Sequence, residues 1–352
     1  MKGFTFALLL AAASGAAAQQ PQDLPVDAKW RATILDQVAQ RYDSLYVYAD
    51  RGALIRRKLS DPAVRARYGE CGTASCLSTK VTEDLQAWTG DKHLRLVFSA
   101  KARPMAGTQD KSSARDGELE AMRRRNFGFH NVERLHGNIG LLEIGRFDAA
   151  ADAAPTAAAA MAFLANTDAL IIDLRNNGGG HADMVAHLMS YFVPEQTHLS
   201  TMKRRNPDDN VQIWTAAAVA GPRYLGKPIY VLTGKRTFSA AEGLTYDLRH
   251  YAGAKVLGER TRGGANPGTF EQLNQHFAVG VPTGVMVNEK VKSNWEGVGI
   301  IPDVEIPADQ AVRTAHLNVL LALLADKKTD GRAEMWQQAV DELGTKFQAG
   351  AK

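Results

Sequence analysis

The sequence has little net charge, no internal repeat and few long apolar runs. Its formal charge is +4 over 352 residues, which is too small and too dispersed to indicate a nucleic-acid partner. The basic cluster 123–125 is interpreted as the solvated face of a helix. Beyond the first residues, no segment is long and apolar enough to cross a bilayer, so we expect no stable membrane insertion. The ordinary apolar and charged fractions, 45% and 23%, predict a globular chain with one large domain and an accessory part.

Cysteine is also scarce. The two cysteines, Cys71 and Cys76, lie close together in the chain. In an oxidising compartment this spacing favours a small disulfide loop. A zinc site would need two further ligands nearby, and none is apparent. The spacing also differs from the Cys-x-x-Cys of redox enzymes, so we predict a disulfide and no metal.

The first residues have the pattern of a signal peptide. One basic residue, Lys2, precedes an apolar run that is too short to span a bilayer. Small residues at 16–18 would allow cleavage before Gln19. A retained membrane anchor is the alternative, although no basic flank follows the run. We therefore expect a signal peptide over residues 1–18 and a periplasmic or secreted protein.

Hydrophobic periodicity divides the rest of the chain. Apolar residues recur at three- and four-residue steps between residues 24 and 90, which predicts a helical domain over 19–90. The polar stretch 99–117 is interpreted as a mobile connection. Predicted strands then alternate with helices, which implies an α/β core over 91–328 with largely parallel pairing. An amphipathic helix is expected within 329–352.

One predicted strand runs directly into three glycines. Residues 169–174 are almost all apolar, as in a strand covered on both faces, and the segment 184–192 predicts a helix. Glycines at 178–180 permit positive φ and the close approach of a substrate. Such a turn exposes a row of backbone N–H groups that can bind developing negative charge. A simple tight turn is the alternative interpretation.

Ser239 stands where a second buried strand, a short polar loop and a helix meet. Ser239 and Glu242 match a capping box, in which the two residues bond each other's backbone amides. A serine at a helix N-terminus is also well placed for nucleophilic attack, because the free amides favour the oxyanion that follows. Both interpretations can apply to the same residue.

Four segments occur in the order found in one enzyme family: Asp-Leu-Arg-Asn-Asn-Gly-Gly-Gly at 173–180, Thr-Phe-Ser-Ala-Ala-Glu at 237–242, Gly-Glu-Arg-Thr-Arg-Gly-Gly-Ala at 258–265 and Gly-Val-Gly-Ile-Ile-Pro-Asp at 297–303. With them the sequence resembles the carboxy-terminal processing (tail-specific) serine peptidases. It looks most similar to their interphotoreceptor-retinoid-binding-protein-like branch, to which the tricorn core protease is related. The gap at 99–117 is several-fold too short for the PDZ domain of other members. The resemblance implies a crotonase- and Clp-protease-like core of ββα units.

Relatives activate the serine in one of two ways. In one, a lysine about twenty-five residues downstream is the base, but counting from Ser239 reaches Gly264, so that lysine is missing. In the other, a histidine from far upstream acts with a glutamate downstream. The resemblance gives these roles to His93 and Glu296. Lys92 stands where a tricorn-like serine would orient the histidine, which leaves open how His93 is held.

The sequence therefore predicts an exported serine endopeptidase that acts on peptides or proteins and needs no cofactor. Ser239 is the expected nucleophile, His93 the base and Glu296 the support of the imidazolium. A non-catalytic lipid or retinoid carrier on the same fold is the alternative. The sequence predicts neither the substrate's sequence nor the oligomeric state.

The glycine turn supplies the remaining predicted site residues. The amides of Gly179 and Ala240 are expected to form the oxyanion hole. Contacts with substrate are expected at Gly178, Gly180 and His181.

Overall fold

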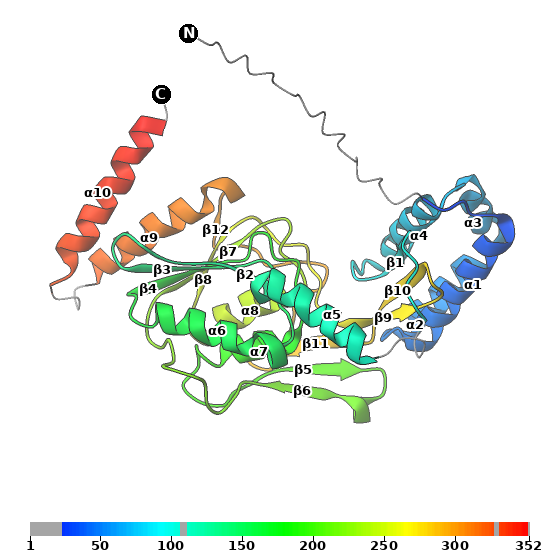
Figure 1. Ribbon diagram of the computed structural model, residues 1–352, viewed down its shortest axis with the longest axis horizontal. Helices are drawn as coiled ribbons and strands as arrows, with labels where there is room; N and C mark the ends of the chain where they lie inside the picture. The colour runs from blue at the N-terminus through cyan, green and yellow to red at the C-terminus, as the bar shows by residue number, and fades with distance from the viewer. Residues whose placement is uncertain (1–22, 106–110, 327–330, 351–352) are drawn as a thin grey trace, which may run out of the picture.

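The structure is a computed structural model that describes residues 23–105, 111–326 and 331–350. The predicted signal peptide, 1–18, lies outside the described residues. Helices near the N-terminus form one end of the molecule, and a larger α/β part forms the other (Figure 1). No helix in the described ranges is long and apolar enough to cross a membrane.

Four helices and one 3-10 turn make up the N-terminal unit: α1 (Ala28–Leu45), α2 (Ala49–Ser60), α3 (Pro62–Arg67), η1 (Tyr68–Glu70) and α4 (Ala74–Thr89). Asp27 caps α1 by accepting a hydrogen bond from the Trp30 N–H. Gly90 ends α4 at a φ of 75°, a left-handed conformation that glycine adopts without strain. A disulfide joins Cys71 to Cys76, whose Cα atoms lie 5.4 Å apart.

A small antiparallel sheet packs under these helices. Its strand order is β1 (Arg95–Phe98), β10 (Phe277–Pro282) and β9 (Gly268–Gln272). Apolar side chains of β1 and β10 share one buried cluster with the helices. Residues far along the chain therefore complete the N-terminal unit, whose strand β1 begins two residues after His93.

The main sheet has six strands in the order β12 (Val304–Glu305), β8 (Lys255–Gly258), β7 (Ile229–Thr233), β4 (Ala169–Asp173), β3 (Ile139–Ile144) and β2 (Phe129–Leu135). All neighbouring pairs are parallel except β2 with β3. Every residue of β4 and β7 is buried, as expected of central parallel strands. The predicted α/β core with largely parallel pairing is therefore present.

Helices cover both faces of the main sheet (Figure 1). One face packs on α6 (Ala150–Leu164), α7 (Ala182–Met189) and α8 (Ala240–Ala252). The other packs on α9 (Ala311–Ala325) and α10 (Ala333–Gly350). Alternate residues of β4 enter the two clusters, because successive side chains of a strand point to opposite faces.

A third sheet lies beside α7 and α8. Its antiparallel order is β11 (Gly284–Asn288), β5 (His198–Arg204) and β6 (Val211–Trp214). The sequence analysis predicted no strand at β5 or β6, whose residues alternate irregularly between polar and apolar. The short turns η2 (Asn126–Gly128), η3 (Pro207–Asp209) and η4 (Ala308–Gln310) complete the described elements.

The prediction for residues 99–117 was wrong in part. The structure forms a helix, α5 (Lys111–Arg124), where a mobile connection was expected. The segment is polar because most residues of α5 are exposed. Met122, near the end of the helix, is buried. The described residues between β1 and β2 form only this helix and the turn η2, which is too little for a PDZ domain.

Candidate active site

Ser239 lies at the turn between β7 and α8, in a strained backbone conformation. Its φ is 57° and its ψ is −122°, a combination that residues other than glycine rarely adopt. The side chain is half-buried and lines two neighbouring cavities. The turn presents the Ser239 hydroxyl to the cavities.

Glu242 holds the Ser239 turn in place. Its buried carboxylate accepts hydrogen bonds from the Ser239 N–H at 2.8 Å and from the Gly263 and Gly264 N–H groups at 2.6 and 2.9 Å. The Thr261 hydroxyl donates a fourth. Burial raises the pKa of Glu242, although these donors oppose the shift. The capping interaction expected from the sequence is thus part of a larger network that joins α8 to the loop at 261–264.

The glycine turn packs against the nucleophile. Gly179 has a φ of 103°, and a Cβ atom at this position would lie 2.9 Å from the Ser239 Cβ. The Gly179 N–H donates to Asn177 Oδ1 at 2.8 Å. Within the described chain, the N–H groups of Gly180 and Ala240 have no hydrogen-bond acceptor. Two backbone donors beside Ser239 are therefore free, but that of Gly179 is engaged.

His93 follows α4 and opens onto the same cleft as Ser239. Both ring nitrogens are buried without a hydrogen-bond partner, and the ring lies 4.4 Å from that of Phe238, centroid to centroid. A Cβ atom on Gly264 would lie 2.6 Å from His93 Cε1. The imidazole therefore occupies the space beside Gly264.

Asp91 is the carboxylate nearest to the His93 ring, with 3.7 Å between Asp91 Oδ1 and His93 Nδ1. It is 1% exposed, and its Oδ2 accepts hydrogen bonds from the Tyr46 hydroxyl and the Asn266 amide at 3.0 and 2.9 Å. Burial alone would raise the pKa of Asp91, but the nearby His93 ring, the Asn266 amide and the His93 backbone N–H outweigh it and lower the pKa. Asp91 is therefore held ionised behind the histidine.

Glu296 also reaches this cluster. One ligand atom from each of Asp91, His93 and Glu296 lies within 4.8 Å of the others. The Glu296 Oε2 accepts from the Ala265 N–H, whereas Oε1 is buried without a partner. Burial and the nearby charge of Asp91 raise the pKa of Glu296 to about 7. Glu296 is thus partly protonated near neutral pH, unlike Asp91.

The same three side chains are the one group in the described ranges that could hold a metal ion. Histidine and carboxylate are suitable ligands for several divalent metals. However, Asp91 already receives two side-chain hydrogen bonds on Oδ2 and the His93 N–H on Oδ1 at 2.9 Å. This bonding suits an acceptor that orients an imidazole.

The lysines near the site lie away from Ser239. The Lys92 ammonium donates to the Arg262 carbonyl, so it ties the N-terminal unit to the core and does not support the His93 ring. Lys235 is largely exposed and pairs with Glu259 at 3.4 Å. Lys255 is exposed on β8, where its ammonium lies 6.0 Å from the Tyr230 ring. None of the three lines either cavity at Ser239.

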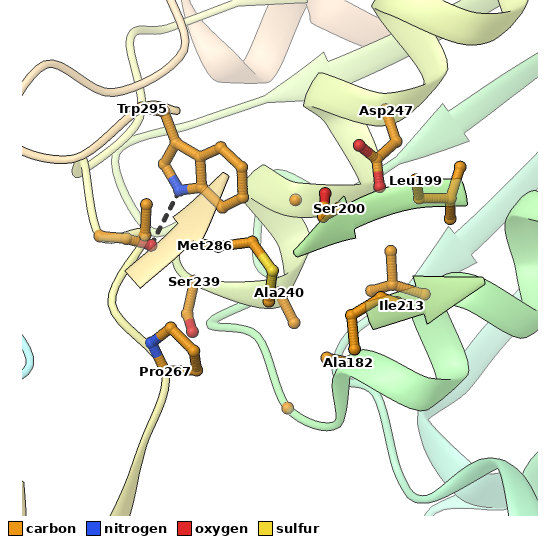
Figure 2. Close-up of a pocket in the computed structure, with 15 residues that line it drawn as sticks. Ala182, Leu199, Ser200, Ile213, Ser239, Ala240, Asp247, Pro267, Met286 and Trp295 are labelled. Atoms are coloured by element: carbon orange, nitrogen blue, oxygen red, sulfur yellow. Dashed lines mark hydrogen bonds between the residues drawn. The ribbon is translucent and has the colours of Figure 1, made fainter. Parts of the chain in front are cut away.

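Two cavities meet at Ser239. The larger, about 1400 Å³ including space open to solvent, is lined by polar and apolar groups that include His93, Gly178 and Gly179. The smaller, about 540 Å³ on the same basis, is mainly apolar and extends from Ser239 past Met286 (Figure 2).

Gly180 lines both cavities, but His181 lines neither. The His181 side chain is 56% exposed near Asp183, at the start of α7. The structure therefore gives no support to the predicted substrate contact at His181.

Sequence reasoning missed Asp91 and the wider role of Glu242. Asp91 is two residues before His93, and an aspartate beside a predicted catalytic histidine was a signal that could have been used. The contacts of Glu242 with residues 261–264 had no local signal, because they join segments that are about twenty residues apart.

Comparisons with known proteins show similarity to serine peptidases. A family model described as "Peptidase family S41" matches residues 138–306. A curated protein of Staphylococcus saprophyticus subsp. saprophyticus, described as "Probable CtpA-like serine protease", is 24% identical over 196 residues. The alignment covers 55% of this chain and 39% of that protein, so the chain spans about two fifths of that relative's length.

Two solved structures share the fold. A "putative peptidase" from Parabacteroides merdae superposes with a TM-score of 0.54 at 18% identity, covering 82% of this chain and 96% of that one. The photosystem II D1 C-terminal processing protease gives a TM-score of 0.50 at 14% identity, covering 81% and 94%. Both support a mixed α/β fold with N-terminal helices. The family match includes the glycine turn, Ser239 and Glu296, so residues 138–306 of this chain are similar to peptidase family S41.

Proposed function

We propose that this chain is an exported serine endopeptidase in which Ser239 is the nucleophile and His93 the general base. One observation carries the proposal: an imidazole with two unpartnered nitrogens shares a cleft with Ser239 and has a buried carboxylate behind it. This is the arrangement that serine hydrolysis requires, because the histidine must exchange a proton with the serine on one side and be oriented on the other.

The reaction then proceeds by acyl transfer. Ser239 Oγ attacks the peptide carbonyl carbon while His93 takes the hydroxyl proton, and the carbonyl π electrons move to the oxygen. When the tetrahedral intermediate collapses, the C–N bond breaks and His93 gives the proton to the leaving amine. A water molecule repeats the sequence on the acyl-enzyme and releases the carboxylic acid.

Asp91 is proposed as the group that orients His93. It lies closest to Nδ1 and has the lowered pKa that a permanent negative partner needs. The 3.7 Å separation shortens to a hydrogen bond with a small ring movement, and such bonds are often long before substrate binds. Glu296, the partner expected from the sequence, is proposed to act as a second, partly protonated carboxyl beside the ring.

The oxyanion hole is proposed to combine the Ala240 N–H with an amide of the glycine turn. Gly180 is the better second donor in this structure, because its N–H is free while that of Gly179 bonds Asn177. Gly179 contributes by its lack of a side chain, which lets the turn approach Ser239. Loss of one such donor typically costs about 3 kcal/mol of transition-state stabilisation.

Other parts of the proposal rest on the sequence and the family. Export rests on the pattern at residues 1–18, and the substrate class, a peptide or protein, on the similarity to peptidase family S41. The predicted crotonase- and Clp-protease-like core is supported by its succession of parallel strands and covering helices.

Labelling with a fluorophosphonate tests the proposed nucleophile. The wild-type protein should be labelled at Ser239, and Ser239→Ala should not react. Wild-type protein that resists labelling, cleaves no member of a broad peptide library and retains bound lipid would instead support the carrier function.

A further inference from the structure

The smaller cavity at Ser239 has one carboxyl group in a mainly apolar lining. Asp247 is 5% exposed and lines this cavity. The Asn288 amide donates to one of its oxygens at 2.8 Å, and no hydrogen bond or ion pair reaches the other in the described chain. Burial raises the pKa of Asp247 to about 7, and no cation opposes the shift. A buried carboxylate without a positive partner is costly, so this group is suited to receive one.

Helix α8 links this carboxyl group to the nucleophile. Ala240, Gly243 and Asp247 lie on the same face of the helix, at i, i+3 and i+7, and all three line the cavity. The helical rise places Asp247 about 10 Å along the axis from Ala240. Figure 2 shows Asp247 at the end of the cavity away from Ser239, with Met286 between them.

The walls between the two ends are apolar. They include the side chains of Val185, Leu199, Ile213, Met286 and Trp295. Trp295 is fixed in this wall because its Nε1–H donates to the Gly264 carbonyl at 2.8 Å. Gly243 lets Trp295 pack closely on α8, since a Cβ atom there would lie 3.3 Å from the Trp295 ring.

A side chain that fills this cavity from Ser239 must be long, apolar along its stem and cationic at its tip. Lysine meets all three requirements, because its extended stem of five bonds reaches about 6 Å from Cα and its tip is a compact ammonium. At the end of the cavity the ammonium would meet the free Asp247 oxygen, and the Ser200 hydroxyl lies close by (Figure 2). Arginine is less suitable, because its guanidinium is planar and needs several acceptors.

We infer that this cavity binds the side chain on the acyl side of the cleaved bond and that Asp247 selects lysine there. The inference rests on the proposed peptidase function. It makes Asp247 a specificity-determining residue, because an uncharged side chain in the same cavity would leave the buried carboxyl group without a partner.

Matched peptide substrates test the inference. Two peptides that differ only in lysine or methionine at this position have stems of similar length but differ in charge. The wild-type protein should favour the lysine peptide in kcat/KM by on the order of 100-fold. Asp247→Asn should reduce this ratio to within a few-fold of one. Glu305→Gln, which removes an exposed carboxylate on β12, should keep the wild-type ratio.

Fluorophosphonate labelling of each protein separates the possible failures. A wild-type protein that is labelled at Ser239 but prefers methionine, or an Asp247→Asn variant that keeps the lysine preference, would overturn the inference alone. Absence of labelling and cleavage in the wild type would overturn the proposed function and the inference with it. If Asp247→Asn does not fold, Asp247→Leu removes the buried polar group, and it should reverse the preference toward methionine.

Discussion

Asp91 and Glu296 flank one histidine, yet their surroundings move their pKa values in opposite directions. Asp91 receives hydrogen bonds that outweigh its burial, whereas Glu296 has one free buried oxygen and the charge of Asp91 nearby. Two carboxyl groups with separated pKa values can take different roles at one site. The hydrogen bonds and charges around Asp91 and Glu296 therefore decide which of them is assigned as the third catalytic group.

Substitution of the two carboxyl groups should have unequal effects. Asp91→Asn should lower kcat by on the order of 10³-fold or more, because the imidazole loses its orienting charge. Glu296→Gln should cost less, on the order of 10-fold, since Glu296 is partly neutral near pH 7. Steady-state kinetics on variants shown to fold by circular dichroism would measure both effects. The reverse order of loss would make Glu296 the orienting group.

Removal of the histidine should nearly abolish activity. His93→Ala is expected to lower kcat by several orders of magnitude, because the Ser239 hydroxyl then has no base. The matched controls, Lys235→Ala and Lys255→Ala, should keep most activity, since both lysines lie outside the cleft. Full activity in His93→Ala would rule out the proposed base.

Glu296 should also make stability depend on pH. Its pKa is raised from 4.5 to about 7 on folding, so between these values the folded state binds more protons than the unfolded state. The free energy of unfolding contributed by Glu296 therefore falls as pH rises from about 4.5 to about 7. Glu296→Gln should gain stability relative to the wild type over this interval, as measured by urea unfolding at pH 5 and pH 8. An equal difference at both pH values would contradict the raised pKa.

At the scale of elements, the turn from β7 to α8 has a strained backbone that hydrogen bonds hold in place. Ser239 has a positive φ, and the Glu242 carboxylate holds its N–H together with the loop at 263–264. Strained backbone persists only where the surroundings fix it, and it occurs often at functional sites. The strained turn therefore lowers the free energy of unfolding, and it places the Ser239 hydroxyl at the cavities.

Glycine at this turn should relieve the strain. Ser239→Gly is expected to be more stable than Ser239→Ala by about 1 kcal/mol, because glycine adopts a positive φ without a Cβ clash. Both variants should be inactive. Urea unfolding of the two proteins would provide the comparison, and equal stabilities would show that the turn is not strained.

At the scale of the whole molecule, the site is assembled across two units. His93 and Asp91 come from the N-terminal unit, and Ser239 and Glu296 come from the core. Arg205 is one of the links between the units, since its guanidinium donates to the carbonyls of Asp43, Ser44 and Tyr46. The distance between base and nucleophile therefore depends on contacts far from the reacting atoms.

Loss of the Arg205 hydrogen bonds should lower activity, although Arg205 contacts none of the reacting groups. Arg205→Ala is expected to reduce the rate of fluorophosphonate labelling by on the order of 10-fold, because small misplacements of catalytic groups are costly. Arg57→Ala, an exposed arginine on α2, is the control and should label at the wild-type rate. An unchanged rate in Arg205→Ala would show that other contacts suffice to position His93.

Local patterns in the sequence determined the elements that carry a strong period or a run of buried residues. The helices of the N-terminal unit, the strands β3, β4, β7 and β8, and the helix after the glycine turn all follow from such patterns. Polar elements such as α5 and β5 had weaker local signals, because much of their surface is exposed and their apolar contacts come from other segments. Ser239 was found from its place between a strand and a helix.

Only the tertiary structure decided how the site is built. It brought Asp91 behind His93, placed the His93 ring in the space that Gly264 leaves, and enclosed Asp247 at the end of an apolar cavity. These features depend on which distant segments pack together and on which polar groups lose water when they do. Such contacts have no period along the chain, because packing and desolvation arise only after the chain has folded.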